Sequence, residues 1–105
     1  MKEDQLIELR SILAGISTML EKDSHIDQMI FLSRLIDKIG QTNSDFIHDL
    51  NSENFWGGSG SILDIEFNDP LDKTRLKSLL KELLIFLSKA GILGKRARSA
   101  NRLLS

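Results

Sequence analysis

Apolar residues recur every three or four positions through most of this chain, and a single glycine-rich stretch interrupts the pattern. The stretch runs from Asn54 to Phe67 and holds three of the seven glycines, the only tryptophan and two of the five phenylalanines. A spacing of three and four places apolar side chains on one face of an α-helix. The sequence therefore predicts a mainly all-α domain whose helices are separated by one central loop.

Two long helices are expected in the first forty residues. The first covers residues 3–21, where its apolar stripe consists of Leu6, Leu9, Leu13, Ile16 and Leu20. Gly15 lies within it at a cost of about 1 kcal/mol in helix propensity, which a close approach by another helix would explain. The second is expected to use Ser24 as its N-cap and to end at Gly40 in the left-handed conformation. The short connection makes the two helices an antiparallel hairpin.

A short helix is expected before the glycines and an extended segment after them. The capping residues Thr42–Asp45 precede a short helix, whose apolar residues are Phe46, Ile47 and Leu50. After the glycines, apolar and acidic residues alternate from Ile62 to Phe67, which predicts one short extended segment. A lone strand needs a partner for its backbone groups. That partner is either another segment of this chain or the same strand of a second subunit.

The last long helix has the clearest boundaries. Asp69 is its expected N-cap, and Pro70 occupies the first helical position. Gly91 and Ile92 predict a Schellman motif at its C-terminal end. The basic residues 93–105 form either a short terminal helix, docked by Leu103 and Leu104, or a frayed tail. Residues 1–105 are thus expected to form one domain, a small four-helix bundle with a central loop.

Composition narrows the class of protein further. The 105 residues include no cysteine, which excludes disulfides and thiolate metal sites. The N-terminus (Met1-Lys2-Glu3-Asp4) is acidic where a secretory leader would be basic, and no apolar run is long enough to cross a membrane. We therefore expect a cytoplasmic protein.

Charge is distributed unevenly along the chain. Residues 1–70 carry a net charge of −8 and residues 71–105 a net charge of +7. Opposite charges either draw the two halves together or attract outside partners. Contact with nucleic-acid phosphates through the basic end is one alternative function. The end lacks interleaved aromatic residues and matches no nucleic-acid motif; its basic residues are Lys89, Lys95, Arg96, Arg98 and Arg102.

The glycine-rich stretch supplies the candidate binding or structural loop, which comprises Trp56, Gly57, Gly58, Gly60, Ser61 and Asp64. Successive amides of such a loop form an anion-binding nest, to which Ser59 and Ser61 add hydroxyls. The lysine of a Walker loop and the third glycine of a dinucleotide fingerprint are both missing. A tight turn is therefore the favoured interpretation, and binding of a small molecule or anion at residues 57–61 is the alternative.

Side chains around the loop suggest how such a turn is held. Trp56 is expected to anchor it in the core or at an interface, in one aromatic cluster with Phe55 and Phe67. The Asp64 carboxylate is expected to accept hydrogen bonds from the amides of the loop.

No group of residues indicates catalysis. Asp45, His48 and Asp49 lie close together in the sequence, but a histidine beside acidic residues is usually a solvated surface group. We therefore expect no catalytic residues, no metal site and no cofactor. The protein is not expected to be an enzyme.

Residues 57–64 also carry a family resemblance. The pattern Gly57-Gly58-x-Gly60-Ser61-x-x-Asp64 resembles the Gly-Gly-x-Gly-Ser-x-x-Asp signature of a small, uncharacterised bacterial family of helical proteins. The resemblance implies a helical fold and no particular activity. By analogy, small bacterial proteins of this kind include toxin-neutralising (immunity-like) and accessory interaction proteins.

The function expected from the sequence is contact with other proteins. The apolar faces of the helices are broader than one small bundle encloses, which predicts a protein partner or a homodimer. The dimer would form through a helix face or through the strand at residues 62–67.

Overall fold

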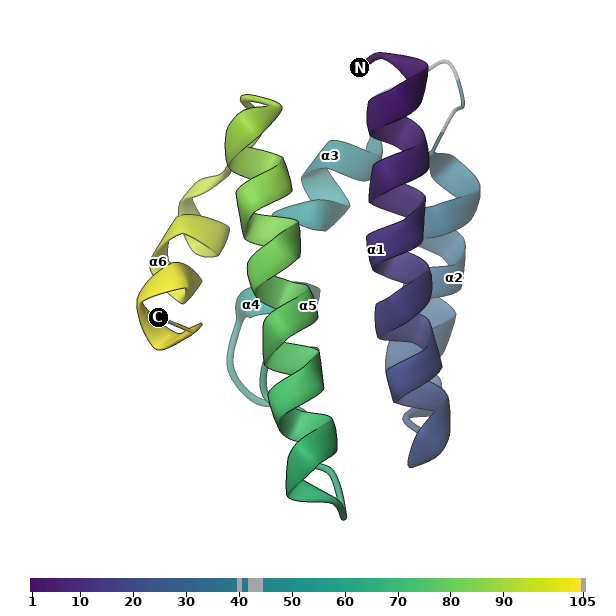
Figure 1. Cartoon of the computed structure of the whole chain (residues 1–105), viewed down its shortest axis with the longest axis vertical. Helices are drawn as coiled ribbons and strands as arrows, with labels where there is room; N and C mark the ends of the chain where they lie inside the picture. Colours follow the sequence, from purple (N-terminus) through teal and green to yellow (C-terminus); the bar gives the residue numbers. More distant parts are fainter. Residues whose placement is uncertain (40, 42–44, 105) are drawn as a thin grey trace.

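The computed structural model describes residues 1–39, 41 and 45–104. Figure 1 shows α1 and α5 side by side, running in opposite directions, with α2 beside α1 and α6 beside α5. The helices in chain order are α1 (Glu3–Lys22), α2 (Ile26–Lys38), α3 (Asp45–Leu50), α4 (Glu53–Trp56), α5 (Pro70–Lys89) and α6 (Lys95–Leu104). The predicted all-α class is confirmed.

The core extends from the contact between α1 and α5 to buried residues of the other helices. It is built mainly from fully buried leucines, among them Leu9, Leu13 and Leu20 of α1 and Leu76, Leu80, Leu83 and Leu87 of α5. Gly15 lies at a close contact between the two helices, because a Cβ atom at this position would lie 3.2 Å from Leu79 Cδ2. Further along, Lys22 Nζ lies 3.1 Å from the buried Asp72 carboxylate. The expected close approach at Gly15 is thus confirmed.

The ends of α5 follow their sequence signals. Asp69 Oδ1 accepts a hydrogen bond from the N–H of Leu71 (2.9 Å), and Pro70 begins the helix. At the other end Gly91 has φ +73, and the N–H of Ile92 donates to the carbonyl of Leu87 (2.9 Å). The predicted N-cap and Schellman motif are both confirmed.

The predicted role of Ser24 was wrong. His25 is the N-cap residue of α2, and Ser24 has φ +56. The N–H of Ser24 donates to the carbonyl of Glu21 (3.3 Å) and that of His25 to Leu20 (3.2 Å). These bonds form a Schellman motif at the end of α1, so Ser24 ends the first helix and does not cap the second.

The predicted strand over Ile62 to Phe67 was also wrong, and the described part of the chain contains no strand. The N–H groups of Ile62 and Leu63 donate to carbonyls of residues 54 and 55, at 2.9 Å each. Lys73 Nζ of α5 donates to the carbonyls of Leu63 (3.1 Å) and Ile65. Turns and one lysine therefore bond to several of the backbone groups for which we expected a partner strand.

Residues 93–105 include α6, which packs on α4 and α5. Ala97, Ala100 and Leu104 of this helix are buried, which accounts for the docking of the basic end. The expected conformation of Gly40 and the capping roles of residues 42–44 lie outside the described residues, as does the side chain of Leu103. Within the described part, no helix combines the length and apolarity that crossing a membrane requires.

Replacement of Ser24 by glycine is expected to raise the free energy of unfolding by about 1 kcal/mol, because glycine adopts a positive φ without the steric cost of a side chain. If Ser24 were an N-cap, the same change would lower it by about 0.3 kcal/mol. Urea denaturation measures the difference. Ser33→Gly, at an exposed position within α2, is the matched control and should lower stability by about 0.5 kcal/mol.

Replacement of Lys73 by methionine is expected to lower the free energy of unfolding by about 1–2 kcal/mol, because two carbonyl groups lose their donor. Lys77→Met changes the same residue type at an exposed position of α5 and should stay within about 0.5 kcal/mol of the parent. Equal effects of the two substitutions in urea denaturation would contradict the role given to Lys73.

Candidate functional site

Trp56 anchors the segment that leads into the glycines. It ends α4 and is only 6% exposed, and its Nε1 donates to the carbonyl of Leu50 (2.8 Å). Its ring stacks on Phe55 at 5.6 Å between centroids, and Phe55 meets Phe31 edge-on. Phe67 packs instead against His25, at 5.5 Å between centroids. Trp56 is therefore a core residue, and the expected inclusion of Phe67 in its cluster was wrong.

The structure requires glycine at some of the three glycine positions of the loop and not at others. A Cβ atom at Gly57 would lie 2.8 Å from Glu53 Cβ, so only glycine fits there. Gly60 has φ +88, a conformation that favours glycine. Gly58 has neither constraint, since a Cβ atom there would meet no other atom within 4 Å. The fold thus explains Gly57 and Gly60 but not Gly58.

Asp64 was predicted to accept hydrogen bonds from the loop, but its backbone N–H donates to Ser61 instead. Ser61 is buried, and its hydroxyl oxygen and its carbonyl accept hydrogen bonds from the Asp64 N–H at 3.3 and 3.2 Å. The Asp64 side chain is exposed. Within the described residues, the loop amides make none of the expected hydrogen bonds to its carboxylate. The geometry of residues 61–64 therefore comes from a turn and not from the acidic side chain.

A basic residue from a distant part of the sequence completes the surface of the loop. Arg96 of α6 and residues 57–61 line a shallow cavity of about 580 Å³, together with Glu53 and Asn54. Asn51 brings the two segments together: its Oδ1 accepts from the N–H of Gly94 (2.5 Å), and its Nδ2 donates to the carbonyl of Ile92 (2.9 Å). No local sequence signal links residue 96 to this loop.

The acidic residue that follows His48 forms a salt bridge. Asp49 pairs with Lys38 at 2.7 Å, and His48 is exposed. In residues 1–39, 41 and 45–104, no three histidine or acidic side chains come together as metal ligands would.

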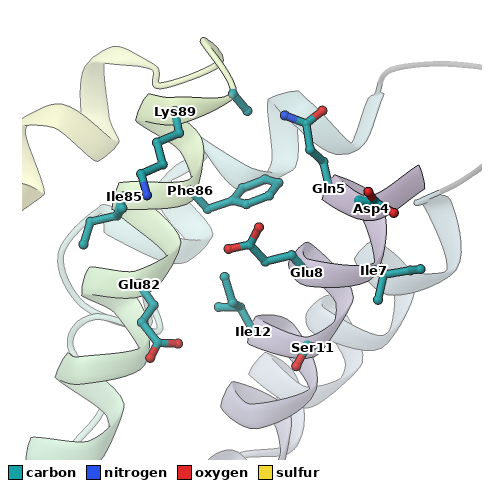
Figure 2. A pocket seen from close by; sticks show the side chains of 11 residues that line it. Asp4, Gln5, Ile7, Glu8, Ser11, Ile12, Glu82, Ile85, Phe86 and Lys89 are labelled. Atoms are coloured by element: carbon teal, nitrogen blue, oxygen red, sulfur yellow. The ribbon is translucent and has the colours of Figure 1, made fainter. Parts of the chain in front are cut away.

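A second cavity, which the sequence did not predict, lies between α1 and α5. It is an open groove of about 700 Å³, with the buried Ile12 and Phe86 at its base. Figure 2 shows Phe86 pointing from α5 toward α1 and Glu8 pointing from α1 toward α5. Ile7 and Ile85 also line it and are 58% and 55% exposed. In Figure 2 Ile7 points away from α5 and Ile85 points away from α1, so these two exposed isoleucines lie at the outer edges of the groove.

The charged groups of the groove are mostly acidic. Asp4, Glu8 and Glu82 line it together with one lysine, Lys89. None of these four side chains forms a salt bridge within the part of the chain that the structure describes. The groove therefore combines exposed apolar surface with unpaired negative charge.

No family of known proteins, no curated protein and no solved structure matches this chain. The resemblance to a bacterial family with the glycine signature thus stays a prediction, and the functional argument depends on the two cavities.

Proposed function

We propose that this protein is a non-catalytic interaction protein whose groove between α1 and α5 receives an amphipathic helix of another protein. The observation that carries the proposal is the pair of half-exposed isoleucines, Ile7 and Ile85, that line an acidic groove. Grooves between helices bind the apolar face of a partner helix in many recognition complexes. An apolar stripe flanked by lysine or arginine is the partner chemistry that fits both properties.

The apolar surface provides affinity. Covering Ile7 and Ile85 would contribute about 1–2 kcal/mol each, because each is already partly covered by its own helix. Beyond Ile85 and Lys89 lies a second hollow of about 310 Å³, between α5 and α6, which adds the half-buried Leu93 to the available surface. A partner helix that follows α5 could contact both hollows.

The charged residues of the groove indicate whether its partner is a different protein or a second copy of this chain. In a symmetric dimer through this groove, the same surface faces itself. The groove carries three carboxylates and one lysine, so its net negative charge would then face itself across the interface, which is unfavourable. A basic partner gains from those carboxylates. We therefore favour another protein over the homodimer predicted from the sequence, whose route through a strand is also absent from the described residues.

The immunity-like or accessory role suggested by the resemblance would act through such a contact. That role stays a prediction, as do the bacterial origin and the cytoplasmic location. Nucleic-acid contact through the basic end also stays a prediction; Lys89 lines the groove, and the other four basic residues lie on α6.

A synthetic helix of about four turns, with leucines on one face and flanking lysines, is expected to bind the full chain. Fluorescence anisotropy measures the affinity, which should fall as salt is raised. Ile85→Ser should weaken binding about tenfold. Ile26→Ser, at a similarly exposed isoleucine of α2, should have little effect. Equal losses from the two substitutions would contradict the groove as the binding surface.

Charge reversal separates recognition from nonspecific adhesion. The Glu8→Lys, Glu82→Lys variant should prefer a peptide with glutamates in place of the lysines. Sedimentation equilibrium on the free protein tests whether a second copy of the chain fills the groove. A dimer that is abolished by Ile85→Ser but not by Ile26→Ser would show that it does, and would overturn the proposal.

A further inference from the structure

We propose that the glycine loop and Arg96 form a binding site for the phosphate group of a small molecule. This inference is independent of the protein-binding groove, because it concerns the cavity lined by residues 57–61 and by the first turn of α6. The geometry that supports it is a run of free amides placed beside an unpaired guanidinium.

Three successive backbone N–H groups are free to bind a ligand. Among the described residues, those of Gly58, Ser59 and Gly60 donate no hydrogen bond. The flanking amides are occupied: Gly57 donates to the carbonyl of Glu53 (2.9 Å) and Ser61 to that of Gly58 (3.1 Å). Consecutive amides near a residue with positive φ, here Gly60, form the concave nest that binds phosphate oxygens.

The loop is held in this shape before any ligand binds. Gln28 Nε2 donates to the carbonyl of Gly60 (2.9 Å), and the N–H of Ile62 donates to the carbonyl of Asn54 (2.9 Å). Trp56 fixes the other side through its bond to Leu50. A preformed loop reduces the entropy lost on binding.

Arg96 supplies the positive charge. Its side chain is exposed and forms no salt bridge in the described part of the chain. Asn51 fixes the start of α6, where a Cβ atom on Gly94 would lie 2.6 Å from Asn51 Oδ1. This contact places Arg96 at the cavity, and a guanidinium binds phosphate oxygens with two parallel hydrogen bonds.

Gly58 has no structural explanation within the fold, but a ligand would provide one. A Cβ atom at Gly58 would meet no other atom within 4 Å. It would therefore project into open space beside the cavity that Gly58 and Arg96 line. A phosphate resting on the amides needs that space. The fold alone predicts that alanine is tolerated at position 58, whereas the binding site predicts that alanine blocks it.

Glu53 indicates what the remainder of the ligand contains. Glu53 is an exposed residue that lines the same cavity, and its carboxylate would repel a phosphate placed next to it. A carboxylate is also a good acceptor for hydroxyl groups. We therefore infer a hydroxylated phosphate monoester, such as a sugar phosphate, with the phosphate at Arg96 and the hydroxyls toward Glu53.

NMR titration of the full chain with glucose 6-phosphate, inorganic phosphate and glucose, at constant ionic strength, tests the site. The amide signals of residues 58–60 should shift with both phosphates and not with glucose. Tighter binding of the sugar phosphate supports the monoester, and equal binding supports free phosphate at the same site. No shift with either phosphate would overturn the proposal.

Matched variants separate a site from general attraction of anions. Arg96→Gln should weaken phosphate binding about tenfold, whereas Arg98→Gln, an exposed arginine of the same helix, should change it less than about twofold. Gly58→Ala should weaken binding while the melting temperature stays unchanged or rises. Glu53→Gln should tighten inorganic phosphate but not glucose 6-phosphate. Shifts that survive in both Arg96→Gln and Gly58→Ala would overturn the proposal.

Discussion

The packing of α1 against α5 is the interaction on which the rest of this structure depends. The helices meet closely at Gly15 and Leu79, and the Lys22–Asp72 salt bridge joins them further along. Toward the N-terminus of α1 they lie further apart, as Figure 1 shows. The groove forms at this wider end, with the buried Ile12 and Phe86 at its base and the exposed Ile7 and Ile85 at its outer edges. The groove is therefore the open end of a helix pair that also contributes to the core.

Polar side chains that bond to backbone groups hold the remaining segments on this pair. Trp56 joins α4 to the end of α3, Asn51 joins α3 to the start of α6, and Lys73 joins α5 to the chain after the glycines. Each of these side chains bonds to backbone groups that lie at the end of a helix or outside the helices. The same bonds place Arg96 at the glycine loop, although many residues separate them in the sequence.

Features that depend on neighbouring residues were predictable, and those that depend on distant residues were not. The ends of α5 follow from Asp69, Pro70 and Gly91, whose effects are local. Alternation after the glycines predicted a strand, but turn hydrogen bonds and the Lys73 side chain bond to the backbone there instead. Ser24 matched an N-cap by composition, yet the end of α1 determines its conformation. The groove and the position of Arg96 required the tertiary structure.

The central claim is that the open end of the α1–α5 pair is where a basic helix of another protein binds. Photocrosslinking in the cells that make the protein tests it most directly, with a photoreactive residue at position 85 in one variant and at position 26 in another. The account predicts a crosslinked product from position 85 alone, in which the attached peptide belongs to a basic amphipathic helix of a different protein. Crosslinks only between copies of this chain, or the same product from both positions, would contradict it.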